Sequence, residues 1–189
     1  MRIILAIVTI LLFISCNNNR VLVKDVEKFI DQQIILPFDW NAVLKGKDVI
    51  LNGFVDVPIK LVVWYDSLVC GSCEVKRMFE WNDITAYADS LNQWFRIVFL
   101  FTPKKENVYT VNYSLKAERF GYPVFIDENA SFAKQNNRLP KNRQLHSFLL
   151  DKNNRVVMVG NPLRNPMLWN LYKSTIQKMI VNNGVLPDK

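Results

Sequence analysis

Glycine is scarce in this chain, with 6 residues in 189, and no segment repeats another. These two absences exclude a fibrous chain, and the composition excludes a disordered one. Hydrophobic residues make up 50% of the sequence and aromatic residues 12%, so a sizeable core can be buried. The length favours one domain preceded by a leader over two domains.

Long runs of one charge are also absent. The formal net charge is +7, yet the Lys and Arg residues are scattered and no five like charges stand together. This pattern is typical of solvated surface charge rather than of a nucleic-acid site, so we expect no nucleic-acid partner. In an exported protein the same positive charge would suit anionic lipid headgroups.

The longest apolar run is short and lies at the N-terminus. Arg2 precedes the apolar stretch Ile3–Ile14, whereas a membrane-spanning helix needs about 20 residues. Residues 1–15 therefore fit a secretory signal peptide. The segment Phe13-Ile14-Ser15-Cys16 resembles the lipobox of bacterial lipoproteins, which implies a lipid anchor on Cys16 and a periplasm-facing place in the cell envelope. An uncleaved N-terminal anchor is the alternative.

Cysteine and histidine are too few for most metal sites. Three cysteines leave one unpaired in an exported protein. If Cys16 carries lipid, then Cys70 and Cys73 form the one possible intramolecular disulfide. A structural zinc ion usually takes four ligands, and the expected domain offers these two cysteines and His146. We therefore predict no metal.

Apolar periodicity predicts alternating helices and strands from residue 59 onward. We expect helices at residues 21–33, 73–92, 105–120, 129–136 and 166–182. We expect a hairpin strand or a pair of strands at 49–57, and single strands at 59–65, 95–101, 122–126, 145–150 and 155–159. The alternation indicates an α/β fold with a largely parallel sheet between helices, and the last two strands add an antiparallel edge. We divide the chain into a signal peptide at 1–15, a tether and N-terminal extension at 16–44, and a domain at 45–189.

The most informative motif is Cys70-Gly71-Ser72-Cys73, between a buried strand and a helix. Free N–H groups and the positive dipole end at a helix start stabilise a thiolate, which is the nucleophilic form of cysteine. We assign Cys70 as the attacking thiol and Cys73 as the resolving thiol of a redox-active disulfide. A purely structural disulfide is the alternative, although closing so small a loop constrains the unfolded chain little.

The element order and the place of this motif resemble the thioredoxin-like family over residues 45–182. The similar branch holds exported, membrane-tethered thiol-disulfide oxidoreductases and related peroxiredoxins. The resemblance implies a central mixed sheet with helices on both faces and an inserted helix and strand at residues 105–136. It also implies reduction or exchange of disulfides in exported proteins, an electron-donating redox partner and no cofactor.

The chain departs from the family at several positions. Val69 stands where the family usually has Trp, Ser72 where it often has Pro, and Trp64 where thioredoxins have a buried acid. Residues 144–148 lack the proline that the family places beside its dithiol. His146 lies in that segment, where an imidazole can stabilise a thiolate or shuttle a proton or simply pack without a role.

Two other functions stay open. The missing proline favours a non-catalytic binding module of the cell envelope, whereas the retained cysteine pair favours an oxidoreductase. Ser67 and Cys70 match part of a peroxiredoxin site, but Val63 replaces the proline expected there.

Overall fold

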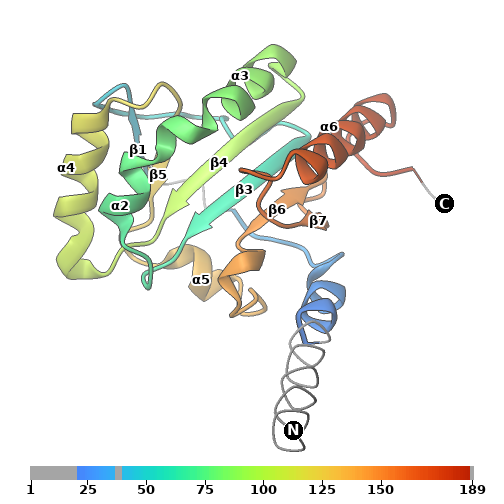
Figure 1. The fold of residues 1–189 in the computed structure, drawn as a ribbon, viewed down its shortest axis with the longest axis horizontal. Coiled ribbons are helices and arrows are strands. Elements are labelled where there is room, and N and C mark those ends of the chain that lie inside the picture. The colour runs from blue at the N-terminus through green and yellow to red at the C-terminus, as the bar shows by residue number, and fades with distance from the viewer. Residues whose placement is uncertain (1–20, 37–39, 188–189) are drawn as a thin grey trace, which may run out of the picture.

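The computed structural model describes residues 21–36 and 40–187, whose strands form one mixed sheet in the order β2-β1-β5-β4-β3-β6-β7 (Figure 1). The strands are β1 (Asn41–Leu44), β2 (Lys47–Val49), β3 (Ile59–Tyr65), β4 (Phe95–Phe101), β5 (Val124–Ile126), β6 (Ser147–Leu150) and β7 (Val156–Val159). The helices are residues 21–29, α2 (Gly71–Lys76), α3 (Asn82–Leu91), α4 (Val108–Glu118), α5 (Ser131–Gln135) and α6 (Pro166–Val181). The α/β class and the mixed sheet predicted from the sequence are confirmed.

Strands β3 and β4 form the centre of the sheet, with the bounds that their apolar runs predict. They pair in parallel from Ile59↔Phe95 to Tyr65↔Phe101, and nearly all their residues are buried. The prediction of a largely parallel sheet was wrong, however, because four of the six pairings between the described strands are antiparallel. Two of these antiparallel pairings, β1 with β2 and β1 with β5, come from β1, whose hairpin the sequence did not reveal.

Helices cover both faces of the sheet, as predicted. On one face α2, α3, α4 and α6 enclose a core that includes Trp81, Phe99 and Tyr172. On the other face, residues 21–29 and α5 cover a second core that includes Phe29 and Phe132. Each fully buried large apolar side chain stabilises the fold by roughly 1.5–3 kcal/mol.

The prediction of one or two strands over residues 49–57 is wrong. The hairpin lies earlier, at β1 and β2, and Lys45 and Gly46 turn it with φ angles of 50° and 81°. Two successive positive φ angles are typical of the type I′ turn that joins such hairpins. Residues 50–58 instead form turns around Gly53, which has a φ of 73°. The alternating pattern there arose from turn residues and not from a strand.

The helix predicted over residues 73–92 is divided into three. The first part, α2, begins at Gly71, and its C-cap is Arg77, whose backbone has φ −100° and ψ 1°. A 3₁₀ helix, η1 (Met78–Trp81), follows and continues into α3. Residues three apart eclipse one another in a 3₁₀ helix. Met78 and Trp81 can therefore both face the core, where both are buried.

The N-terminal extension packs onto the sheet. Strand β1 pairs with β5, and Phe29, Ile34 and Leu36 are buried. The boundary expected between residues 44 and 45 falls in the turn of the β1–β2 hairpin. The predicted signal peptide and Cys16 lie outside the described residues. Within residues 21–36 and 40–187, no helix combines the length and the apolar character needed to cross a membrane.

Candidate functional site: the dithiol at the start of α2

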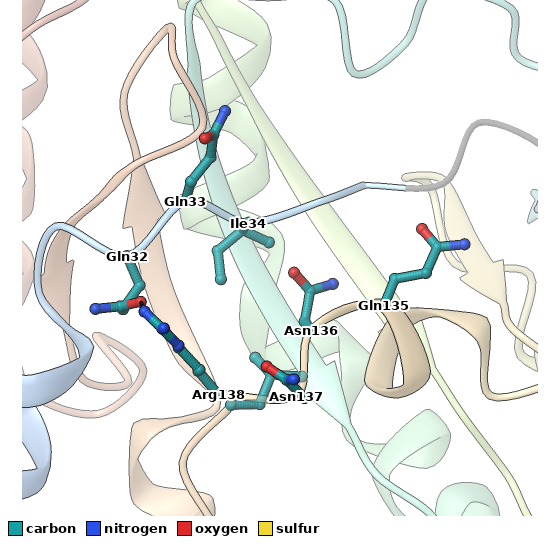
Figure 2. A pocket seen from close by; sticks show the side chains of 8 residues that line it. Gln32, Gln33, Ile34, Gln135, Asn136, Asn137 and Arg138 are labelled. Carbon is teal, nitrogen blue, oxygen red and sulfur yellow. Dashed lines mark hydrogen bonds between the residues drawn. The ribbon is translucent and has the colours of Figure 1, made fainter.

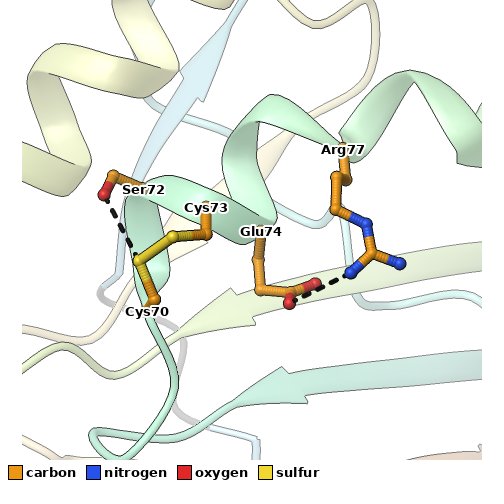
Figure 3. The surroundings of a disulfide bond; sticks show 5 residues. All are labelled: Cys70, Ser72, Cys73, Glu74 and Arg77. Atoms are coloured by element: carbon orange, nitrogen blue, oxygen red, sulfur yellow. Dashed lines mark hydrogen bonds and ion pairs between the residues drawn. A yellow bond between two sulfur atoms is a disulfide. The ribbon is translucent and has the colours of Figure 1, made fainter.

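Cys70 and Cys73 are joined by a disulfide at the start of α2, with their Cα atoms 5.2 Å apart (Figure 3). Both residues are exposed. Cys70 is the N-cap of α2, and its carbonyl oxygen accepts hydrogen bonds from the N–H groups of Cys73 (3.0 Å) and Glu74 (3.1 Å). The pair thus lies on the surface, at the carboxyl end of the central parallel strand β3, and incoming groups can reach it.

A tight loop explains why Cys70 caps a helix directly after a buried strand. The Oδ1 atom of Asp66 accepts a hydrogen bond from the N–H of Leu68 (2.9 Å), and its carbonyl oxygen accepts one from the N–H of Val69 (3.3 Å). Aspartate commonly stabilises turns in this way. Asp66 therefore ends β3 and directs the chain back toward the sheet as α2.

The electrostatic surroundings of the disulfide are mixed. No side chain caps the start of α2 by a hydrogen bond. The hydroxyl of Ser72 lies 3.7 Å from the Cys70 sulfur. Glu74 in the first turn lies 3.7 Å from the guanidinium of Arg77. An uncapped helix start favours a thiolate, whereas a carboxylate in the first turn opposes it. Arg77 reduces that opposition.

Gly71 has a role that the sequence did not reveal. A Cβ atom at this position would lie 2.6 Å from the Cγ2 of Val111 on α4. The absence of a side chain therefore allows α2 and α4 to pack closely beside the dithiol.

His146 is buried at the start of β6, in contact with the loop that leads to the dithiol. Its ring lies over that of Trp64 at a centroid distance of 4.3 Å. The Nε2–H group donates to the carbonyl oxygen of Pro140 (2.9 Å), which leaves Nδ1 facing the Oδ2 of Asp66 at 3.8 Å. Burial lowers the pKa of His146, although the hydrogen bond to Pro140 and the charge of Asp66 oppose this shift.

Within the described part of the chain, no hydrogen bond joins His146 to either cysteine. Its connection to the dithiol runs through Asp66, which shapes the turn before Cys70. Arg143 touches the same loop, because its guanidinium lies 3.5 Å from the carbonyl oxygen of Leu68. The segment that lacks the family's proline therefore still faces the loop before the cysteines.

Trp64 and Tyr65 point to opposite faces of β3. Trp64 contacts the ring of Phe132 and donates its indole N–H to Thr102 (3.0 Å). Tyr65 stacks on Phe101 on the face that carries α2. Burial raises the pKa of Tyr65, and the Glu74 carboxylate raises it further. The sequence did not indicate that Tyr65 lies on the same face as α2, because in the sequence it is one more apolar residue of the strand.

A depression of about 290 Å³ lies away from the dithiol, between the segment after residues 21–29 and the segment after α5 (Figure 2). Its lining is rich in carboxamides, but some of them already have partners. Asn136 exchanges two 2.8 Å hydrogen bonds with the backbone of Ile35, and Arg138 donates to Gln32 (3.0 Å). These contacts fasten the N-terminal extension to the domain.

No protein-family model and no curated protein matches this chain by sequence. Solved structures do match. A conserved uncharacterized protein from Geobacillus kaustophilus has 16% identity and a TM-score of 0.56, with 85% of this chain and 86% of that chain covered. AhpC from Enterococcus faecalis has 13% identity and a TM-score of 0.52, with 85% and 99% covered.

The thioredoxin domain of a thiol-disulfide oxidoreductase from Bacteroides vulgatus has 16% identity and a TM-score of 0.46, with 78% of this chain and 97% of that domain covered. The mixed sheet, the helices on both of its faces and the C-x-x-C motif at the start of α2 together confirm the thioredoxin-like fold.

Proposed function

We propose that this protein is a thiol-disulfide oxidoreductase of the cell envelope that exchanges disulfides in exported proteins. One observation carries the proposal: an exposed Cys70–Cys73 disulfide begins α2 directly after the central strand of a thioredoxin-like fold. An exposed disulfide at a helix start can be reduced and re-formed by thiols from outside.

The proposed reaction begins with the reduced protein. The Cys70 thiolate attacks one sulfur of a substrate disulfide, so that a mixed disulfide forms and one substrate thiolate leaves. The Cys73 thiolate then attacks the Cys70 sulfur, which releases the second substrate thiolate and closes the Cys70–Cys73 disulfide. Two electrons pass to the substrate, and a dithiol partner returns two electrons to the protein.

A Cys73→Ser variant tests this assignment. Without the resolving thiol, the variant should accumulate mixed disulfides through Cys70, and non-reducing gel electrophoresis with an unfolded disulfide protein as substrate would detect them. Cys70→Ser is the matched control and should trap far less. An inert Cys70 in the Cys73→Ser variant would instead support a non-catalytic binding module. Rapid consumption of hydrogen peroxide by the reduced wild type would support a peroxidase.

The reduction potential of the pair gives a second test. Structural disulfides in secreted proteins typically have potentials below about −300 mV. We expect a higher potential here, measured by equilibrating the protein with glutathione buffers and counting free thiols by alkylation. A pair that stays oxidised in strongly reducing buffers would favour a structural disulfide.

The proposed location rests on the lipobox-like segment that ends at Cys16. Several acyl chains anchor a protein stably, whereas one chain binds only marginally. In cells of a lipoprotein-processing bacterium, the wild type should incorporate labelled fatty acid and sediment with membranes. Cys16→Ala should abolish the labelling, and Cys70→Ser should keep it. Labelling that persists without Cys16 would contradict the proposal.

A further inference from the structure

A buried lysine lies at the opposite end of β3 from the dithiol. Lys60 is the second residue of the strand, and only 3% of its surface is exposed. Tyr65, at the dithiol end, lies five positions further along the strand, which corresponds to roughly 17 Å. Lysine is almost never buried to this degree unless it is paired. The position therefore calls for a physical explanation.

The amine of Lys60 has little to neutralise it. Its Nζ donates a hydrogen bond to the carbonyl oxygen of Val57 (2.8 Å). Among residues 21–36 and 40–187, no carboxylate lies within ion-pair distance of it. Burial lowers the pKa of Lys60 to about 8, although the charges of Asp151 and Asp56 oppose the shift. At pH 7 most of this amine is still charged, but its neutral fraction is far larger than that of an ordinary lysine.

Lys60 also lines a cavity of about 340 Å³. Apolar side chains, among them Leu36, Val55 and Pro58, form part of its wall, and Asp56 and Lys152 are exposed residues of the same lining. The cavity thus combines an amine of lowered pKa, apolar surface and a carboxyl group. A lysine amine in such surroundings is an activated nucleophile, and its characteristic electrophile is a carbonyl carbon.

We propose that Lys60 is the nucleophile of a second site, separate from the dithiol, that binds small aldehydes or ketones as imines. The neutral amine adds to the carbonyl carbon, and one proton moves from nitrogen to oxygen to give a carbinolamine. Loss of water then forms the C=N bond, so no oxidant or reductant is needed.

Lys152 provides a matched internal control, because it lines the same cavity but is exposed. At pH 7 an amine with a pKa of about 8 is about 10% neutral, whereas an ordinary lysine with a pKa of about 10.4 is about 0.04% neutral. Even after a loss of access through burial, we expect Lys60 to react at least about tenfold faster than Lys152 at pH 7.

The experiment treats the protein with propanal and sodium cyanoborohydride, which converts an imine to a stable secondary amine, and locates the modified lysines by peptide mass spectrometry. The ratio of Lys60 to Lys152 modification should exceed about 10 at pH 7 and fall as the pH rises toward 10. A ratio near 1 at pH 7, or a ratio independent of pH, would overturn the proposal.

Two variants separate binding in the cavity from simple amine reactivity. Val55→Trp should fill the cavity and reduce modification of Lys60 at least tenfold while Lys152 reacts as before. Asp56→Asn removes a charge that raises the pKa of Lys60, so the neutral fraction of the amine and its rate of modification at pH 7 should rise. Unchanged modification of Lys60 in Val55→Trp would show that the cavity does not admit the aldehyde and would defeat the inference. Far-ultraviolet circular dichroism and cooperative urea unfolding report that each variant is folded.

Discussion

At the scale of single residues, the dithiol depends on neighbours that act through the backbone. Asp66 forms the turn before Cys70, and His146 packs against Trp64 and faces Asp66. His146 therefore acts, in this structure, on the shape of the loop before the cysteines. Protonation of a buried imidazole costs free energy in the folded protein. Acid therefore destabilises the packing of His146 against this loop.

The first prediction concerns the pH dependence contributed by His146. Its pKa is lowered in the folded state, so the unfolded chain binds the extra proton first, and stability is lost as the pH falls below about 6.5. Denaturant unfolding at pH 7.5 and pH 5 should show this loss in the wild type. His146→Gln should be less stable at pH 7.5, through lost packing, but should lose less on acidification. An equal loss in both proteins would contradict the prediction.

The second prediction concerns Lys60, whose charge is costly to bury. Lys60→Met keeps most of the apolar stem and removes the charge, so it should raise the free energy of unfolding near pH 7 by about 1–2 kcal/mol. The pKa of Lys60 is about 8 in the folded protein and near 10.4 in the unfolded chain. The wild type therefore gains stability as the pH rises between these two values. The difference between the two proteins should therefore shrink by pH 10, as measured by urea unfolding. A difference that does not change with pH would show that the charge is not its source.

At the scale of elements, the contact between α2 and α4 holds the dithiol in place. Gly71 meets Val111 where no Cβ atom fits, and α2 itself is only six residues long. So short a helix has little stability of its own and depends on tertiary packing. The position of Cys70 is therefore set largely by α4, which lies about 40 residues further along the chain.

The third prediction tests this packing. Gly71→Ala should destabilise the protein by about 1–3 kcal/mol, because the new methyl group overlaps Val111. Val111→Ala makes room for it, so the double variant should be more stable than the sum of the two single changes predicts. A double-mutant cycle of urea unfolding measures this coupling. Strict additivity would mean that the two side chains do not meet.

At the scale of the whole molecule, stability comes from the sheet and its two cores and not from the disulfide. Two apolar clusters fill the two faces, whereas the disulfide joins residues only three apart. Closing so short a loop removes little entropy from the unfolded chain. The fold can therefore tolerate the redox cycling that the proposed function requires.

The fourth prediction follows from this distribution of stability. Reduction of the disulfide should lower the free energy of unfolding by no more than about 2 kcal/mol and leave the far-ultraviolet circular dichroism unchanged. Urea unfolding with and without a phosphine reductant gives the comparison, and Cys70→Ser controls for effects of the reductant. Cooperative loss of structure on reduction would instead identify the disulfide as a structural brace.

Several features of the fold depend only on local pattern and can be predicted from the sequence. The apolar runs of β3 and β4 require burial on both faces, the periodicity of α6 requires one apolar side, and the spacing of Cys70 and Cys73 allows one short disulfide. Local pattern failed at residues 49–57, where turn residues alternate as a strand would. It also failed at the β1–β2 hairpin, whose short strands carry too little apolar signal.

Tertiary structure alone decided which distant residues meet. Three features depend on how distant segments pack in the sheet and its helices. They are the contact between Gly71 and Val111, the contact between Asp66 and His146, and the burial of Lys60 beside a cavity. No periodicity records such contacts, because a side chain's neighbours across the fold depend on strand order and helix placement. The chemistry available to Cys70 and Lys60 is therefore readable only after the chain has folded.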